Sequence, residues 1–425
     1  MKFEKTVNGR LDEEILYGVH ESGLRVYIIP KKGFSKSYAI YATQFGSIDD
    51  VLISENGKIS LPDGTAHFLE HKLFEEEGGK NAFDLFALTG ASSNAFTSFD
   101  ITAYLFACTD NFYKNLDILL EFVNNPYFTD ENVAKEQGII GQEIKMYEDD
   151  PSWRVFFNMV EAMYEKNTVR KDIAGTVESI SHITPELLYK CCEKYYNPSN
   201  MLLCMVGDIN PSEAEKYINR HVKASAAKPE KRRVSGENGG TVKKYVSQKL
   251  SVSKPIFIIG FKEKAEGESG ETLFKKQIKT QILMEVLFGR SSRFYEQLYN
   301  EGLIDGSFDK DTELEQNYGF SSVSGESKNP KEVYERALEY IDGVKKNGLC
   351  SDDIERAKKM LIGKNLRRFN SVERLGNDFI RFFMNGFAPL DYDSFVENMS
   401  QSELEERLAE HFDRDYSVLS VVEPE

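Results

Sequence analysis

The stretch TDENVAKEQGIIGQEI, residues 129–144, can be laid without gaps on SDDIERAKKMLIGKNL, residues 351–366. The segments HFLEHKLF, 67–74, and QILMEVLF, 281–288, align in the same way. Few residues are identical, but the order of apolar and polar positions is shared, which is typical of an internal repeat. Because 425 residues exceed the usual size of one core, we expect two copies of one unit in this chain.

Both copies contain strand-like stretches. In the first copy, RVYIIP (25–30) and SYAIYATQF (37–45) are rich in β-branched and aromatic residues, as strands usually are. In the second copy, KPIFIIGF (254–261) and the terminal YSVLSVV (416–422) have the same character. These strands accompany helical segments in both halves, so the pattern predicts the α+β class.

The repeated segment of the first half is predicted to be a helix. Thr129 or Asp130 can serve as its N-cap, and the helical pattern continues to a break at Pro151.

Three ranges follow from this organisation. Residues 1–222 are predicted to form an N-terminal αβ domain, and 242–425 a degenerate repeat of it. Between them, residues 223–241 lack periodicity and are rich in Ala, Lys, Gly and Ser, which is the composition of an exposed linker.

Composition excludes several classes of protein. A formal charge of −16, with KPEKRR (228–233) as the only short basic cluster, argues against a nucleic-acid binder. No segment approaches the roughly 18 consecutive apolar residues of a membrane span, and the N-terminus has no signal-peptide core, so we expect a cytoplasmic protein. Five cysteines without a CxxC pair argue against both disulfides and a thiolate metal site.

The segment HFLEH, residues 67–71, carries the strongest chemical signal. On a helix, His67, Glu70 and His71 share one face, because residues three and four apart are neighbours there. Two neutral imidazoles at this spacing can bind one Zn²⁺, and the glutamate beside them can take a proton from the water that the metal activates. His-x-x-Glu-His is the inverted form of the metallopeptidase motif His-Glu-x-x-His. The alternative is an amphipathic helix whose histidines only pack or face solvent.

A catalytic zinc site needs a third protein ligand. Glu136 and Glu143 are seven residues apart on the predicted helix, so they lie on one face and only one of them need reach the metal. The spacing alone leaves the choice between them open.

The three segments HFLEH, SSNAFTSFDITAY and EQGIIGQEIKMYEDDP together resemble the pitrilysin or insulinase (M16) group of zinc metallopeptidases, which includes the mitochondrial processing peptidases. The likeness is greatest to the shorter bacterial members, built from two αβ-roll domains of mostly antiparallel sheet with helices packed on it. It implies that the two domains form a clamshell around a peptide. It also implies zinc ligands His67, His71 and Glu143, with Glu70 as general base and Glu136 orienting a ligand histidine.

The same resemblance assigns a substrate strand. SSNAFTS (92–98) matches the strand that the family places beside the zinc, where the main chain pairs with an extended peptide. Asn94, Ala95 and Phe96 are therefore expected substrate contacts. For Phe96, packing in the core is an equally good expectation.

One departure from the family is visible in SSRFYEQLYNEGLIDGSF (291–308). Family members carry here an arginine and, seven residues later, a tyrosine that bind the substrate carbonyl. Tyr299 stands at the arginine's place, and Asp305 or a neighbour at the tyrosine's place. We therefore expect either a heterodimer whose related partner subunit supplies the pair, or a self-sufficient homodimer or monomer that uses Tyr295 or Tyr299.

The expected function is that of a zinc-dependent endopeptidase acting on peptides or unfolded segments. Its rivals are a zinc-bearing subunit that is inactive alone, and a non-catalytic scaffold or peptide-binding member of the family. A structural zinc site is the weakest alternative, since such sites usually have four protein ligands, often cysteines.

Overall fold

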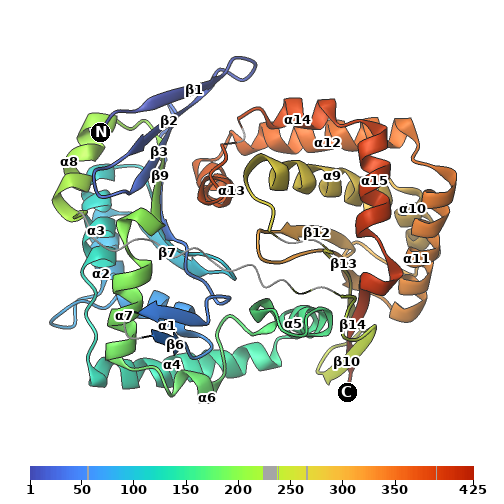
Figure 1. Cartoon of the computed structure of the whole chain (residues 1–425), viewed down its shortest axis with the longest axis horizontal. Helices are drawn as coiled ribbons and strands as arrows, with labels where there is room; N and C mark the ends of the chain where they lie inside the picture. Colours follow the sequence, from blue (N-terminus) through green and yellow to red (C-terminus); the bar gives the residue numbers. More distant parts are fainter. Residues whose placement is uncertain (55–56, 224–236, 238, 265–266, 389) are drawn as a thin grey trace. The chain divides into compact units, whose positions relative to one another are not determined.

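The structure is a computed structural model that describes residues 1–54, 57–223, 237, 239–264, 267–388 and 390–425 (Figure 1). The predicted linker, 223–241, lies largely outside the described residues. The chain forms two compact units. Unit 1 comprises Met1–Ile144, Lys171–Arg232 and Arg367–Leu390, and unit 2 comprises Lys145–Arg170, Arg233–Leu366 and Asp391–Glu425.

Unit 1 is built on a seven-stranded sheet with the order β1-β2-β3-β9-β4-β8-β7. All neighbours are antiparallel except β3 and β9. Its strands are β1 Glu4–Asn8, β2 Glu13–Val19, β3 Arg25–Pro30, β4 Ser37–Thr43, β7 Ser92–Thr97, β8 Thr102–Cys108 and β9 Met201–Gly207, and β5 Val51–Ser54 pairs separately with β6 Gly57–Ser60. Its helices are α1 Thr65–Leu73, α2 Ala82–Thr89, α3 Phe112–Asn124, most of α4 Asp130–Asp149, α6 Val177–Ile180, α7 Pro185–Tyr195, α8 Pro211–His221 and α13 Val372–Met384.

Unit 2 is built on a five-stranded sheet with the order β10-β14-β11-β13-β12, in which only β10 and β14 run parallel. Its strands are β10 Tyr245–Leu250, β11 Ile256–Lys262, β12 Asp309–Leu314, β13 Gly319–Glu326 and β14 Ser417–Pro424. Its helices are α5 Pro151–Met163, α9 Gly270–Phe288, α10 Arg293–Asn300, α11 Pro330–Asn347, most of α12 Ser351–Arg368, α14 Tyr392–Asn398 and α15 Gln401–His411.

The two sheets share one topology. The order β3-β9-β4-β8-β7, with its single parallel pair, is repeated as β10-β14-β11-β13-β12. Along the chain, α9 follows β11, and α1 follows the equivalent β4 after the intervening β5–β6 pair. Helices α3 and α11 directly follow the equivalent strands β8 and β13. The predicted α+β class and the repeat of one αβ unit are therefore confirmed.

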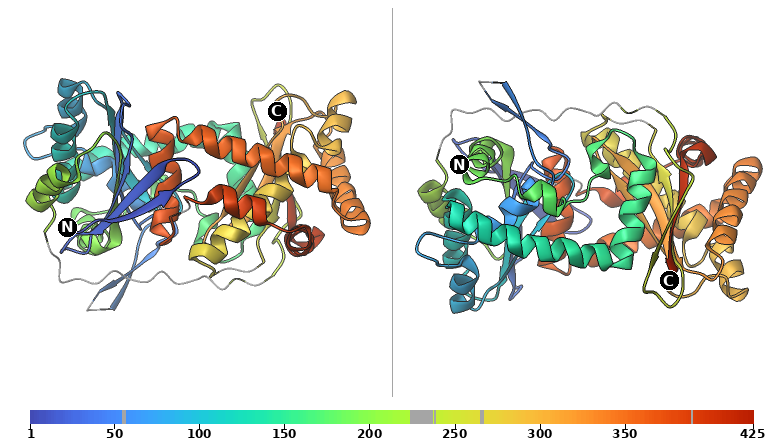
Figure 2. Two further views of the ribbon diagram at one scale, coloured as in Figure 1. Left: turned by 90° about the horizontal axis from the view of Figure 1, so that it is seen from above. Right: turned by 90° about the horizontal axis from the view of Figure 1, so that it is seen from below.

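The two repeats exchange one helix each. Each exchanged helix packs in the unit that the other repeat mainly builds. Helix α5 follows α4 in the first half of the sequence but belongs to unit 2, whereas α13 follows α12 in the second half but belongs to unit 1. As domain boundaries, the predicted ranges 1–222 and 242–425 stay predictions. Figure 2 shows α4, within which the chain passes from unit 1 to unit 2, as a continuous helix.

Helix α13 joins unit 1 through its apolar face. Leu375, Phe379 and Phe383 are buried in one core with side chains of the sheet, and the Phe383 ring stacks on Tyr27 with ring centres 3.8 Å apart. Gly376 permits this approach, since a Cβ atom at this position would lie 2.5 Å from the ring of Tyr38.

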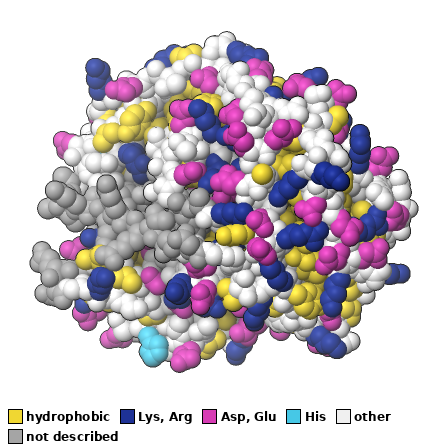
Figure 3. Space-filling model, turned by 45° about the vertical axis from the view of Figure 1, so that its right-hand side comes forward, with side chains coloured by type: hydrophobic (Ala, Val, Ile, Leu, Met, Phe, Trp, Pro, Cys, Tyr) yellow, Lys and Arg dark blue, Asp and Glu magenta, His cyan; other side chains and the backbone are white. Residues whose placement is uncertain are grey.

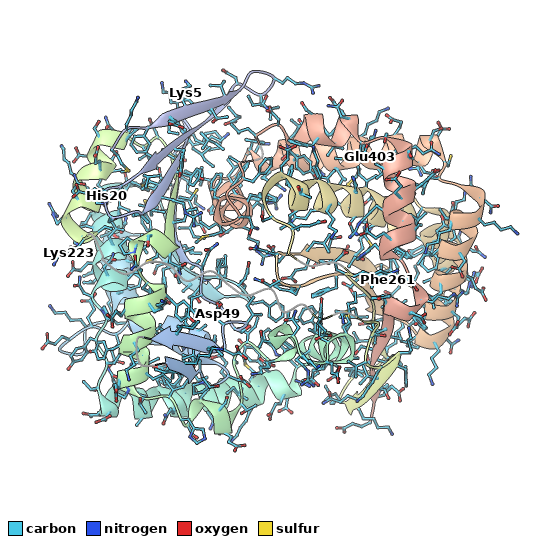
Figure 4. The ribbon with its side chains drawn as sticks, in the orientation of Figure 1. Lys5, His20, Asp49, Lys223, Phe261 and Glu403 are labelled. Carbon is cyan, nitrogen blue, oxygen red and sulfur yellow. The ribbon has the colours of Figure 1, made fainter. Side chains whose placement is uncertain are left out.

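Helix α5 packs on the sheet of unit 2 in a corresponding way. A Cβ atom on Gly260 of β11 would lie 2.1 Å from Met163 and 2.5 Å from Met159, so glycine leaves the space that these methionines fill. The neighbouring Phe261, labelled in Figure 4, is buried, and the centre of its ring lies 5.1 Å from that of Phe412. Both exchanged helices therefore contribute to the core of the unit that they join.

The surface carries mixed charge. On the face drawn in Figure 3, basic and acidic side chains are interspersed. Every helix that the structure describes is too short or too polar to cross a lipid bilayer.

Candidate metal centre

Helix α1 presents the HFLEH segment and begins at a glycine with little freedom for substitution. Gly64, the N-cap, has φ 89°, and a Cβ atom there would lie 2.4 Å from the Ala174 carbonyl oxygen. Such a φ is strained for other residues, and the space is already filled by backbone. The start of α1 is thereby held against the loop that contains Ala174.

His67 and His71 lie on one face of α1, as predicted, with ring centres 4.6 Å apart. Glu143 of α4 lies opposite them. Its Oε1 is 3.8 Å from His67 Nε2, and its Oε2 is 3.5 Å from His71 Nε2. One donor atom from each of the three residues falls within 4.8 Å of the other two. Among the described residues, no other three or more His, Cys, Asp or Glu side chains come together in this way.

The residues fit a zinc ion by their chemistry and spacing. Two imidazoles and one carboxylate are a usual catalytic zinc set, and ligand atoms at roughly 2.0–2.2 Å from one ion are about 3.4 Å from one another in a tetrahedron. The separations of 3.5 and 3.8 Å are close to this value.

The protonation of His67 also suits a metal ligand. Burial, followed by the neighbouring charge of His71, lowers the pKa of His67 to about 4. The imidazole is therefore neutral near pH 7, and a neutral imidazole is the form that binds a metal.

His71 is oriented by Glu136, the other glutamate on the same face of α4. His71 Nδ1 donates to Glu136 Oε1 over 3.2 Å, which leaves Nε2 free to face Glu143. Burial alone would lower the pKa of His71, but the hydrogen bond to Glu136 and the charges of Glu70 and Glu143 outweigh it and raise the pKa. Burial alone would raise the pKa of Glu136, but the hydrogen bond and charge of His71 and the charge of Lys72 lower it.

Glu70 is not one of the three donor residues, and a residue of strand β7 holds its side chain. Its Oε2 accepts a hydrogen bond of 2.6 Å from Thr97 Oγ1. Burial raises the pKa of Glu70, and the bond from Thr97 counteracts part of that rise. Thr97 lies in the SSNAFTS segment, but no local pattern marked it as a residue of the site.

Comparisons with known proteins identify the family of this chain. A family model described as "Insulinase (Peptidase family M16)" matches residues 57–177, and one described as "Peptidase M16 inactive domain" matches residues 182–361. The uncharacterized zinc protease YmfH of Bacillus subtilis strain 168 is 41% identical over an alignment that covers 98% of each chain. The chain belongs to peptidase family M16.

Solved structures support the same assignment. The crystal structure of an M16-like peptidase from Alicyclobacillus acidocaldarius is 34% identical with a TM-score of 0.92, covering 100% of this chain and 99% of that chain. The periplasmic protease PqqL of Escherichia coli shares the fold at 18% identity and a TM-score of 0.76, but the match covers 97% of this chain and only 48% of PqqL. This M16 chain therefore corresponds to about half of that longer protease.

At the equivalent positions, the second repeat of this M16 chain has neither of the two histidines and none of the three glutamates of the metal centre. In the two gapless alignments, Gln281, Met284 and Glu285 replace His67, Glu70 and His71, and Lys358 and Asn365 replace Glu136 and Glu143. The replacements have partners within unit 2. Glu285 pairs with Lys310 over 2.7 Å, and Asn365 Nδ2 donates to Asp393 over 2.9 Å. Unit 2 thus keeps the fold with ordinary structural pairs at these positions.

The predicted substrate residues lie on β7, which is one of the two edge strands of the unit 1 sheet. Asn94 is exposed, and its Oδ1 accepts from the Ala95 backbone N–H over 2.9 Å. Phe96 packs against the core cluster of unit 1. Its side chain therefore has a packing role, and only its backbone remains a candidate for substrate pairing.

The positions that matched the family's arginine and tyrosine lie in unit 2. Tyr299 of α10 is 51% exposed, and its ring stacks on Tyr295 with centres 5.6 Å apart. Asp305 accepts from Lys254 over 2.5 Å, and the hydrogen bonds of Lys254 and Ser307 lower the pKa of Asp305 to about 2. Asp305 is thus an ionised residue tied into a turn, and it cannot donate a hydrogen bond to a carbonyl.

Proposed function

We propose that this chain is a zinc-dependent endopeptidase that hydrolyses peptides or unfolded segments. The observation that carries the proposal is the convergence of His67, His71 and Glu143, with Glu70 beside them on the same helix. Two imidazoles, one carboxylate and a separate glutamate form one of the residue sets that zinc-dependent peptidases use.

His67, His71 and Glu143 would hold the zinc ion. When bound, zinc supplies a Lewis acid that polarises a peptide carbonyl and lowers the pKa of water. Glu136 receives the Nδ1–H of His71 and so fixes the tautomer whose Nε2 lone pair faces the site.

Glu70 is the proposed general base. Thr97 occupies Oε2, which leaves Oε1 to accept a proton from the attacking water and to return it to the leaving amine. Burial raises the pKa of Glu70, and a raised pKa makes it easier for a carboxylate to take up a proton during the reaction.

Strand β7 is the proposed docking edge for the substrate. An extended peptide can add to an edge strand through main-chain hydrogen bonds, which read little of the peptide's sequence. The Ala95 N–H, now bonded to the Asn94 side chain, is one donor that such a peptide would take over. Pairing with Asn94, Ala95 and Phe96 therefore engages backbone groups chiefly.

A second candidate is a zinc-bearing subunit that needs a partner chain. It is favoured by Tyr299 and Asp305, because neither position has the positive charge of the family's arginine and Asp305 is bound to Lys254. A related subunit in a heterodimer would then supply the missing pair, and loss of one such donor can cost about 10²–10³ in rate. In a homodimer or monomer, the exposed Tyr299 or the neighbouring Tyr295 would have to serve instead. If no assembly cuts peptides, a non-catalytic peptide-binding role remains.

The test is hydrolysis of a mixed quenched-fluorescent peptide library by the purified chain. We expect cleavage within peptides that is lost on chelation and restored by zinc. The same assay with a candidate partner chain separates the two proposals. For a partner-dependent subunit we expect the partner to raise turnover by roughly 10²–10³-fold, which is the factor that loss of one oxyanion donor costs. Cleavage that persists in the chelated, zinc-free chain would overturn both.

A further inference from the structure

Lys72 directly follows His71 and is completely buried, with 0% of its side chain exposed. A buried ammonium group is tolerated when carboxylates neutralise it. Lys72 Nζ donates to Glu75 Oε2 over 2.5 Å and lies 3.7 Å from Glu136 Oε2. Lys72 therefore sits between two carboxylates, and one of them reaches the metal centre.

Glu136 uses its two oxygens for different partners. Oε1 accepts from His71 Nδ1 over 3.2 Å, while Oε2 faces Lys72. Because the two oxygens belong to one rigid planar group, a cation that restrains one of them also restrains the other. The contacts thus form a continuous path Glu75–Lys72–Glu136–His71.

Helix geometry explains how neighbours in sequence reach opposite sides of Glu136. Consecutive residues on a helix are about 100° apart, so Lys72 points away from the face that carries His67 and His71. It enters the interior of unit 1, where its helix neighbours Phe68, Leu69 and Leu73 are also buried.

We propose that Lys72 is a positioning residue for the metal centre. It holds the Glu136 carboxylate in the orientation that receives the His71 Nδ1–H, and so keeps His71 Nε2 directed toward Glu143. This inference rests on the proposed zinc site and extends it to a residue outside the HxxEH motif.

Lys72 can act on the metal in two ways, and the two predict opposite changes in zinc affinity when the lysine is removed. A positive charge acting directly repels a cation, so its removal would strengthen zinc binding. Acting through Glu136 and His71, Lys72 strengthens zinc binding, and its removal weakens it. The direction of the change therefore decides between them.

The experiment is zinc affinity by chelator competition in the whole chain carrying Lys72→Met. We expect the zinc Kd to rise about tenfold, the lower end of the roughly 10–100-fold seen when groups that orient a ligand are lost. In a double-mutant cycle, Lys72→Met should add little to Glu136→Gln, because both act through one carboxylate. The absorption spectrum of the Co²⁺-substituted protein should change in the single variant, as a reoriented His71 would require.

Lys262→Met is the matched control. Lys262 is also buried, with 1% of its side chain exposed, and pairs with Glu237 over 2.8 Å in unit 2. Its loss should lower stability and leave the zinc Kd unchanged. If Lys72→Met does not fold, Lys72→Gln retains a hydrogen-bond donor and should raise the zinc Kd by a smaller factor.

An unchanged or lower zinc Kd in a folded Lys72 variant, or additivity with Glu136→Gln, would overturn the role of Lys72. A wild-type chain that binds no zinc would instead overturn the proposed function. The two failures are therefore distinguishable in one set of measurements.

Discussion

Thr97 Oγ1 donates a hydrogen bond of 2.6 Å to Glu70 Oε2. Thr97 is the last residue of the edge strand β7, and Glu70 lies on α1 beside the candidate zinc ligands. The bond therefore links the strand proposed to pair with substrate to the proposed general base. A peptide added to β7 would be placed relative to Glu70 through this contact.

Replacing Thr97 with valine should lower kcat and leave zinc content unchanged. Valine keeps the shape of threonine but removes the donor to Glu70. A hydrogen bond to a charged group contributes about 1.5–3 kcal/mol, so we expect a fall in kcat of about 10–100-fold. The measurement is steady-state turnover of a cleaved library peptide, with metal analysis of the same samples.

Thr43→Val is the control for that change. Thr43 is buried on β4, and its hydroxyl donates to the Tyr195 carbonyl oxygen rather than to Glu70. We expect lower thermal stability with normal kcat. Equal losses of kcat in both variants would show that Thr97 matters only for folding.

The two glutamates of α4 should respond differently to amide substitution. Glu143→Gln replaces a proposed ligand oxygen and should leave the purified protein with little zinc. Glu136→Gln should retain zinc with an affinity about 10–100-fold lower, because Glu136 contacts His71 and not the metal. Zinc stoichiometry after dialysis against a weak chelator checks both, and the reverse order would exchange the two assignments.

Gly64→Ala should destabilise the protein. The new Cβ atom would meet the Ala174 carbonyl oxygen at 2.4 Å, and φ 89° is strained for alanine. We expect a loss of about 1–3 kcal/mol in the free energy of unfolding.

Gly138→Ala is the matched control, because Gly138 lies within α4 and a Cβ atom there meets nothing within 4 Å. Alanine should stabilise this helix by about 0.5–1 kcal/mol. Urea denaturation compares the two variants, and equal stability would contradict the close approach at Gly64.

Glu237 should make stability depend on pH. Burial alone would raise its pKa, but hydrogen bonds from Lys262 and from the backbone N–H groups of Glu165, Lys166 and Asn167 lower it to about 2, from an ordinary value of 4.5. A lowered folded-state pKa gives stability that is present above about pH 4.5 and is lost as the pH falls through about 2.

The comparison is urea denaturation of wild type and Glu237→Gln between pH 6 and pH 3. The wild type should be more stable near pH 6, and the difference between the two proteins should shrink as the pH falls. A difference that stays constant over this range would show that folding does not lower the pKa of Glu237.

Much of this arrangement could be predicted from local sequence. The i, i+3, i+4 spacing places His67, Glu70 and His71 on one helical face, and the seven-residue spacing places Glu136 and Glu143 together. What local spacing could not decide is which glutamate faces both histidines. That choice depends on how α4 crosses α1, and Glu143 is the one near the Nε2 atoms of both rings.

Other features depend on contacts between distant segments. The burial of Lys72 follows from its position between Glu75 and Glu136, and a lysine after a motif histidine carries no local sign of that. Likewise, the apolar faces of α5 and α13 indicate that each packs on a sheet but do not indicate which sheet. The equivalent folds of the two repeats offer each helix a similar surface.

The most direct test of the central claim is the zinc content and peptide turnover of wild type and Glu70→Gln, in whichever assembly cuts peptides. We predict about one zinc in both proteins, with turnover abolished or greatly reduced only in Glu70→Gln, because glutamine keeps the shape of the base but cannot accept the proton. A Glu70→Gln protein that retains zinc and cuts peptides at the wild-type rate would contradict the account.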